Sequence, residues 1–519
     1  MKRRSFLQSS SFLSLPLFVN GLPISSLGSQ SFFNTFDDDG DNILVLIQLN
    51  GGNDGLNTII PLQHYDLLAN VRSNVIIPDN ELLKVSDDFA FHPEMGGMMT
   101  LYDEAKMTIV HDAGYPDQNR SHFRSTDIWT TGSPADEFWT TGWIGRYLQN
   151  RYADYPEGYP SEQFPDPFAL TIGSNVSETC QGTITNFSLA LADPLTIAPV
   201  ASGGEDEVPD TPYGKELEFL RTTIAQANAY GSVISEAAEK GSNISNLYDD
   251  GDSLAQQLKA IALLISGGLK TRIYIANIGG FDTHANQVEN GDPTVGEHGT
   301  LLRRLSNAVH AFQDDLSSLG LEEKVLTMTF SEFGRRIRSN DSLGTDHGTA
   351  APLLVFGSCV NPGFIGESPA LPDQPSQSDG VPMQFDFRSI YGSVLMDWFG
   401  VEKEEIQSLL FEEFSYIPII KSCRTTTSTD DPVIVEGIES NNFPNPFDGW
   451  TTIRFRSRGE RVHMTLFDAT GHQLKVITDQ FFNQGEHEIR LDGNQLMPGN
   501  YFYRIQTATA VKTKAIVRI

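Results

Sequence analysis

Two segments of the chain place a carboxylate close to an imidazole in a glycine-rich stretch. Asp346 and His347 are adjacent, and Asp282 and His284 repeat the pair one residue apart, with His298 opening the next predicted helix. An oxygen and a nitrogen donor together suit a divalent ion of the Zn or Mn type. A single Asp-His pair is more often a capped turn or a hydrogen-bonded histidine. The two pairs and His298 together in one domain favour a metal site over that structural alternative.

These polar residues follow apolar runs that are typical of buried strands. Asp54, Asp282 and Glu332 each come just after such a run. The predicted strands cover residues 42–49, 108–110, 272–276 and 325–330, and the predicted helices cover residues 253–265 and 299–319. Strands that alternate with helices predict an α/β domain with a mostly parallel central sheet flanked by helices. Ligands of such sheets bind beyond the carboxyl ends of the strands, where these residues would converge.

The composition restricts the class of protein. The chain has 519 residues, enough for roughly two to four domains, and 39% of them are hydrophobic. Its net charge of -31 argues against nucleic acid as a partner, because phosphate backbones are neutralised by Lys and Arg. The three cysteines stand in no metal-ligand spacing and do not imply a disulfide framework, so we assign them no role.

Five segments occur in an order that resembles a known bacterial family. The segments are residues 49–58, 119–123, 280–287, 331–335 and 344–350. Together they resemble the family catalogued as domain of unknown function 1501, over roughly residues 40–420. That family is grouped with the alkaline phosphatase and sulfatase superfamily, so the resemblance implies an alkaline phosphatase-like fold.

The superfamily resemblance implies one or two divalent ions. It assigns a first ion to Asp54, Asp346 and His347, and a second ion to Asp282, His284 and His298. Many superfamily members use Asp-x-x-x-His at the second site and a further histidine after the Asp-His-Gly loop. Here the spacing is Asp-x-His, and no histidine lies between His347 and the C-terminal module. The number of ions is therefore left open between one and two.

The resemblance also implies a nucleophile. Ser121 falls where the superfamily places a serine that attacks a phosphorus or sulfur centre with the help of a metal ion. Arg335 or Arg336 would bind the non-bridging ester oxygens. The structural alternatives are an N-cap at Ser121, before a helix over residues 123–129, and surface charge at the arginines. The maturation pattern of formylglycine sulfatases is absent at Ser121, which disfavours that class.

The N-terminus predicts a targeting segment over residues 1–30. Lys2-Arg3-Arg4 precedes a short, weakly apolar, Ser-rich stretch. The Arg3-Arg4-Ser5-Phe6-Leu7 run resembles the twin-arginine export signal, and an ordinary Sec signal is the alternative. No later run approaches the roughly 20 apolar residues of a spanning helix, so we expect no transmembrane segment in the mature protein.

The composition changes after Lys421. Residues 421–440 form a polar linker rich in Thr, and residues 441–519 show short alternating strands separated by turns. This pattern predicts a small antiparallel β-sandwich. Its Phe-Pro-Asn-Pro-Phe entry and Pro-Gly-Asn-Tyr-Phe-Tyr-Arg run resemble the sorting domain of the type IX secretion system of Bacteroidetes. The resemblance implies contact with that secretion machinery and a protein that is secreted or attached to the cell surface. A generic Ig-like adhesive module is the alternative.

Two functions follow as expectations. The first is an exported, metal-dependent hydrolase that acts on phosphate or sulfate esters of a small molecule or polymer, with Ser121 as nucleophile. The second is a non-catalytic cell-surface binding protein that retains the phosphatase-like fold. The retained Asp54, Ser121, Asp346 and His347 favour the first function, and the altered second site favours the second.

Overall fold

The computed structural model describes the chain from the first predicted strand onward, with gaps. The described residues are 41–194, 211–421, 440–457, 460–468, 473–493, 496–507 and 511–519. The predicted signal peptide, residues 1–30, lies outside them, and so does the predicted linker except for its end residues. The contacts divide the chain into two units, Met1–Arg424 and Thr425–Ile519.

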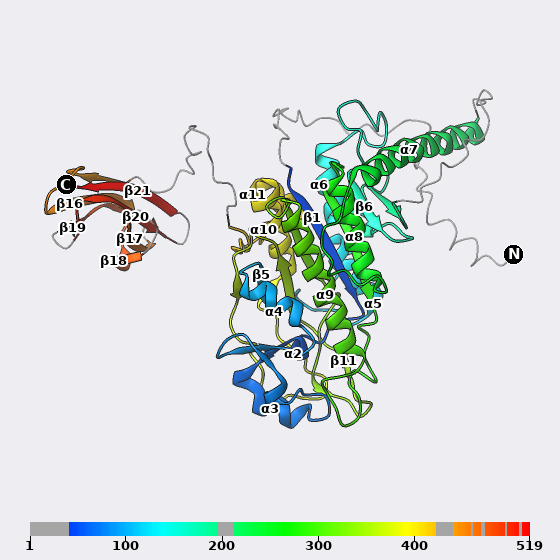
Figure 1. The fold of residues 1–519 in the computed structure, drawn as a ribbon, viewed down its shortest axis with the longest axis horizontal. Helices are drawn as coiled ribbons and strands as arrows, with labels where there is room; N and C mark the ends of the chain where they lie inside the picture. The colour runs from blue at the N-terminus through cyan, green and yellow to red at the C-terminus, as the bar shows by residue number, and fades with distance from the viewer. Residues whose placement is uncertain are drawn as a thin grey trace. The chain divides into compact units, whose positions relative to one another are not determined.

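The first unit is built around a nine-stranded sheet (Figure 1). Its strands are β1 (Ile43–Asn50), β5 (Met107–Gly114), β6 (Ala169–Ile172), β7 (Ser188–Leu191), β8 (Ile273–Gly279), β9 (Val325–Phe330), β12 (Ala351–Phe356), β13 (Gly363–Ile365) and β14 (Phe385–Asp386). They lie in the order β13-β5-β12-β9-β1-β8-β6-β7, and β14 also pairs with β5. β12 runs antiparallel to its neighbours β5 and β9, whereas the other pairs are parallel. The mostly parallel sheet confirms the predicted fold class.

Helices cover both faces of this sheet. They are α2 (Gly55–Thr58), α3 (Tyr65–Val71), α4 (Gly96–Asp103), α5 (His122–Thr131), α6 (Trp143–Arg151), α7 (Pro212–Lys240), α8 (Ser253–Ser266), α9 (Glu297–Ser318), α10 (Phe387–Phe399) and α11 (Lys403–Leu409). Three short 3-10 helices, η1 (Leu62–His64), η2 (Asp79–Glu81) and η3 (Glu178–Cys180), connect them. α8 and α9 run side by side in front of β1 in Figure 1.

The two faces of β1 bury different cores. Val45, Ile47 and Leu49 pack with residues of α4, α8 and α9, whereas Leu44 and Leu46 pack with residues of α5, α6, α10 and α11. Alternate residues of a strand point to opposite faces, so a run that is apolar at every position is buried on both faces. This central position holds the loop after β1 firmly over the sheet.

Small sheets and glycines complete the edge where the strands end. β2 (Ile59–Pro61), β3 (Leu83–Lys84) and β4 (Phe89–Phe91) form one sheet, and β10 (Arg335–Ser339) and β11 (Thr345–His347) form a hairpin. Gly51 has φ +123°, and a Cβ there would lie 2.2 Å from the Asp282 amide nitrogen. A larger residue at this position would therefore force apart the loops that follow β1 and β8.

The second unit contains two antiparallel sheets. β15 (Ser440–Phe443), β16 (Trp450–Ser457) and β19 (Gly485–Asp492) form one sheet, and β17 (Glu460–Asp468), β18 (Gln473–Phe482), β20 (Gly499–Gln506) and β21 (Val511–Arg518) form the other. Ile453 and Phe455 of the first sheet share one core with Met464 and Tyr503 of the second. Two sheets around one core form the predicted β-sandwich.

The cysteines differ from each other in state. Cys180 is a buried free thiol, and Cys359 is disulfide-bonded. The sequence did not predict this bond, because its cysteines show no recognisable spacing. A disulfide is typical of proteins that leave the reducing cytosol.

Candidate metal centre

Parallel strands bring three loops to one edge of the sheet. The register pairs Asn50 of β1 with Gly279 of β8, and Gln48 of β1 with Phe330 of β9. The chain segments that follow these strands therefore start at the same level. The β10–β11 hairpin and the start of α5 lie against the same edge, through hydrogen bonds described below.

Four side chains meet there in what we call the histidine cluster: His122, Asp282, His284 and His347. Asp282 Oδ1 lies 3.1 Å from His347 Nε2, 3.2 Å from His284 Nε2 and 3.4 Å from His122 Nε2. The Nε2 atoms of His284 and His347 are 2.8 Å apart. Ligand atoms of His122, Asp282 and His347 all lie within 4.8 Å of one another, as in a group that holds one metal ion.

The opposite ring nitrogen of each histidine is fixed by an oxygen acceptor. His122 Nδ1 lies 2.8 Å from Glu332 Oε1, and His284 Nδ1 lies 3.0 Å from Asp346 Oδ1. His347 Nδ1 donates to the carbonyl oxygen of Arg120 at 2.8 Å. A neutral imidazole that donates from Nδ1 carries its lone pair on Nε2. Histidines that bind metal through one nitrogen and donate from the other to a carboxylate or carbonyl show this same arrangement.

The convergence of these lone pairs fits a cation. The Nε2 atoms of the three histidines all lie within 3.4 Å of the same Asp282 carboxylate oxygen. Without a positive charge between them, the lone pairs of His284 and His347 would repel at 2.8 Å. Three imidazoles and one carboxylate form a nitrogen-rich ligand set that suits Zn²⁺ and is compatible with Mn²⁺.

Arg335 holds the Asp282 carboxylate in place. The Arg335 guanidinium is 1% exposed and donates to Asp282 Oδ1 at 2.8 Å. It also donates to four backbone carbonyl oxygens, those of Gly51, Gly52, Phe281 and Thr345. Burial raises the pKa of Asp282, but the hydrogen bond and the positive charge of Arg335 outweigh it, and the pKa falls to about 2. Asp282 is therefore ionised across the physiological range.

Asp54 lies away from the cluster, in a buried polar network. Its carboxylate is fully buried, forms an ion pair with Arg72, and accepts a hydrogen bond from Gln287 Nε2 at 2.6 Å. His298 belongs to the same buried region, where its Nε2 lies 2.9 Å from Asn53 Oδ1. Burial lowers the pKa of His298 to about 4, so its ring is neutral at pH 7. The structure thus brings Asp282, His284, Asp346 and His347 together but keeps Asp54 and His298 apart from them.

Ser121 directly precedes His122, a member of the histidine cluster, in the chain. It is exposed and occupies the N-cap position of α5, as the structural alternative predicted. Its hydroxyl makes no capping hydrogen bond to the first turn of α5, all of which the structure describes. The next residue, His122, was not among the predicted ligands, although the 119–123 segment was singled out. A histidine that opens a helix at the carboxyl edge of the sheet is the signal that could have identified it.

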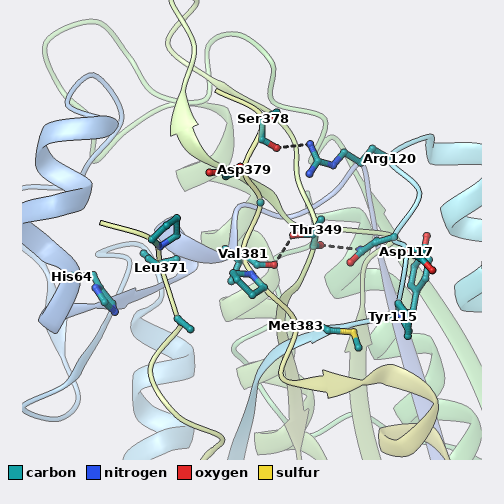
Figure 2. Close-up of a pocket in the computed structure, with 16 residues that line it drawn as sticks. His64, Tyr115, Asp117, Arg120, Thr349, Leu371, Ser378, Asp379, Val381 and Met383 are labelled. Atoms are coloured by element: carbon teal, nitrogen blue, oxygen red, sulfur yellow. Dashed lines mark hydrogen bonds between the residues drawn. The ribbon is translucent and has the colours of Figure 1, made fainter. Parts of the chain in front are cut away.

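Two further arginines flank the cluster beside a cavity. Arg336 Nη1 lies 3.2 Å from Asp346 Oδ2. The positive charges of Arg336 and Arg120 repel each other. Burial lowers the pKa of Arg120, and the nearby Arg336 charge lowers it further. Arg120 lines a cavity of about 790 Å³ and donates to the carbonyl oxygen of Ser378 across its wall (Figure 2). The cavity and the cluster therefore share Arg120.

Two family models match the chain. The model described as a protein of unknown function (DUF1501) matches residues 233–398, which include Asp282, His284, Asp346 and His347. The model described as a secretion system C-terminal sorting domain matches residues 441–518. No curated protein sequence matches the chain.

The solved structures that match the chain resemble it only distantly. Latent PorU of Porphyromonas gingivalis is 18% identical, with 17% of this chain covered, 10% of that chain covered and a TM-score of 0.15. A protein in the alkaline phosphatase superfamily from Vibrio parahaemolyticus is 9% identical, with 85% and 83% covered and a TM-score of 0.30. The phosphonate monoester hydrolase of Silicibacter pomeroyi is 11% identical, with 91% and 88% covered and a TM-score of 0.30. The chain spans about a tenth of the length of PorU, the first of these relatives.

The sorting domain settles where the protein goes. Of the helices in the described part of the chain, none is both long enough and apolar enough to cross a bilayer. The sorting-domain match confirms the predicted export, to the medium or to the cell surface, and supports contact with the secretion machinery. The DUF1501 model and the sorting-domain model thus match the two parts of the chain whose sequence motifs predicted these resemblances.

Proposed function

We propose that the protein is an exported, metal-dependent hydrolase of phosphate or sulfate esters, and that the histidine cluster is its metal site. The observation that carries this proposal is the orientation of three histidines. Each donates its Nδ1 proton to an oxygen and presents Nε2 to Asp282 Oδ1. When bound, a divalent ion such as Zn²⁺ or Mn²⁺ would supply Lewis-acid polarisation of the ester and neutralise developing negative charge.

We propose one ion per chain. His122, Asp282, His284 and His347 would hold it, and Asp346 and Glu332 would orient two of the imidazoles. Asp54 is an unsuitable ligand because Arg72 already neutralises its buried carboxylate. His298 likewise faces Asn53 in the buried network. Of the one or two ions that the sequence allowed, the structure favours one.

Arginines in the site would have separate roles. Arg335 is enclosed by four carbonyl oxygens and Asp282, so we propose that it positions Asp282 and does not contact the ester. Arg336 is partly exposed and Arg120 lines the cavity. Two guanidinium groups close to each other favour binding of an anion, because each is otherwise repelled by its neighbour. They would hold the non-bridging ester oxygens.

Ser121 remains our proposed nucleophile. Its exposed hydroxyl is unused as a helix cap and precedes His122 directly. In the proposed reaction, Ser121 Oγ forms a bond to phosphorus or sulfur while the alcohol leaves, and water later releases the inorganic anion.

The test is turnover of 4-nitrophenyl phosphate and 4-nitrophenyl sulfate by the metal-loaded full chain. The wild type should hydrolyse at least one ester. Ser121→Ala should abolish turnover and keep the metal, whereas His347→Ala should lose both. The exposed Ser342 offers a matched control, since Ser342→Ala should leave turnover unchanged. Turnover that survives Ser121→Ala would exclude the nucleophile, and a wild type inert toward every ester would exclude the hydrolase.

A non-catalytic binding protein is the second candidate. It is favoured by the ion pair of Asp54 with Arg72, because this pair removes a carboxylate that the superfamily resemblance assigns to a metal ion. This candidate predicts that the metal-loaded wild type retains anionic ligands but releases no product from them.

A further inference from the structure

A buried glutamine joins the two segments that carry most of the histidine cluster. Gln287 is fully buried, in the loop between β8 and α9. Its Oε1 accepts a hydrogen bond from Thr345 Oγ1 at 2.6 Å and another from Thr283 Oγ1 at 3.3 Å. Both threonines are also fully buried. One amide oxygen therefore connects the loop that follows β8 with the start of β11, two segments that are far apart in the sequence.

The two threonines are close neighbours of cluster residues in the chain. Thr283 lies between Asp282 and His284, and Thr345 lies two residues before His347. The backbones of the two segments also meet there, because the Thr345 amide donates to the Thr283 carbonyl oxygen at 3.2 Å. The Nε2 atoms of His284 and His347 are 2.8 Å apart. A change in the separation of the two segments would therefore change the distance between these two nitrogens directly.

The direction of the Gln287 amide is fixed by a charge on its other side. Gln287 Nε2 donates to Asp54 Oδ2 at 2.6 Å, and Asp54 is paired with Arg72. An ionised carboxylate only accepts hydrogen bonds, so the NH2 group of the amide has to face Asp54. The amide oxygen then has to face the two threonine hydroxyls. The buried ion pair thus determines that the acceptor of Gln287 is directed toward the segments that carry the cluster.

We propose, on the basis of the metal site of the proposed hydrolase, that Gln287 is a positioning residue of the histidine cluster. Its amide oxygen sets the separation between the Asp282–His284 segment and β11. Asp54 acts through Gln287 and needs no contact with the ion. Replacement of a residue that orients metal ligands weakens metal affinity by about 10- to 100-fold. Gln287 bonds to neighbours of the ligands, so the lower end of that range is expected, a loss of about tenfold.

Titration of the metal-free full chain with Co²⁺ tests this inference, because the visible absorption bands of Co²⁺ report both its affinity and its coordination geometry. Gln287→Met keeps the length of the side chain and removes its amide. The variant should bind Co²⁺ about tenfold more weakly than the wild type, with bands of altered position or intensity. Circular dichroism shows that the compared chains are folded. A merely structural role would lower the stability of the variant but leave the Co²⁺ spectrum of the folded chain unchanged.

Thr345 tests the same contact from its other end. Thr345→Val removes the hydroxyl and should weaken Co²⁺ binding about fivefold, the contribution of one neutral hydrogen bond. Thr345→Ser keeps the hydroxyl and should bind Co²⁺ as the wild type does. Gln287→Met combined with Thr345→Val should lose little more affinity than Gln287→Met alone, because both changes remove one shared hydrogen bond. Losses that multiply in the double variant would mean independent effects and would overturn the inference.

Gln313→Met is the matched control. Gln313 is a buried glutamine of α9 whose Nε2 donates to Thr327 Oγ1 at 3.3 Å, in the middle of β9. Its replacement should leave the Co²⁺ affinity and spectrum unchanged. Unchanged Co²⁺ binding by folded Gln287→Met refutes the positioning role alone. A wild type that shows the expected Co²⁺ binding but hydrolyses no ester refutes the hydrolase alone, and a wild type that binds no Co²⁺ refutes both.

Discussion

Glu332 orients His122, and its neutralisation should weaken metal binding without unfolding the chain. The Glu332 side chain is 4% exposed. Its Oε1 lies 2.8 Å from His122 Nδ1 and accepts from the Gly51 amide at 2.9 Å, while its Oε2 accepts from Ser331 Oγ at 3.3 Å. Glu332→Gln keeps the shape of the side chain but removes its charge.

The expected loss follows from the bond to His122. A hydrogen bond to a charged group is worth about 1.5 to 3 kcal/mol, and a neutral one about half of that. The difference of about 0.75 to 1.5 kcal/mol corresponds to a roughly 4- to 13-fold weaker metal affinity. Substitution of residues that orient metal-bound histidines weakens affinity by about 10- to 100-fold, which overlaps this range.

Competition with a calibrated chelator measures the affinity, and circular dichroism monitors the fold. Glu323→Gln is the control, because Glu323 is exposed and lies just before β9, away from the cluster. The metal affinity of the Glu323→Gln variant should equal that of the wild type. If Glu332→Gln binds metal as tightly as the wild type, then His122 is not a ligand oriented by this carboxylate, and the assignment of the cluster fails.

Three further predictions concern stability, each read from chemical denaturation. Burial raises the pKa of Asp112 to about 7. Between pH about 4 and about 7 the folded chain therefore keeps a proton on Asp112 that the unfolded chain has lost. The wild type should lose up to about 4 kcal/mol of stability as the pH rises through this range. Asp112→Asn should remove this loss and be the more stable protein at pH 8; an unchanged pH profile would refute the buried acid. Arg335→Lys should cost about 3 kcal/mol because an ammonium cannot reach all five acceptors, whereas Arg336→Lys should cost less than about 1 kcal/mol; equal costs would contradict the buried role. Asp54→Asn should cost about 3 to 5 kcal/mol by leaving Arg72 unpaired, while the folded fraction keeps its metal; metal lost from folded protein would place Asp54 at the ion.

The sequence predicted the central strands well because burial on both faces leaves an unbroken apolar run. The predicted strand at residues 325–330 has the bounds of β9, and the helix predicted at 253–265 corresponds to α8. β5 extends beyond its predicted end through His111 and Asp112, two polar residues that are buried by tertiary packing. The sequence did not predict the β10–β11 hairpin, because its Arg-Arg-Ile-Arg-Ser strand has one apolar residue.

The site was only partly predictable, because some of its contacts depend on tertiary packing. Residue types and strand ends identified Asp282, His284 and His347, since parallel strands bring their carboxyl ends together. The partner of Asp54 could not be deduced, because its ion pair with Arg72 depends on how α3 packs beneath the loop. His122 required knowledge of where α5 starts relative to the sheet.

The metal content of the purified full chain tests the central claim most directly. Elemental mass spectrometry should find one divalent ion per folded wild-type chain. The ion should be absent from Asp282→Asn and retained by Asp379→Asn, a carboxylate of the neighbouring cavity. No bound ion, two ions per chain, or an ion that survives Asp282→Asn would contradict the assignment of the histidine cluster as a single metal site.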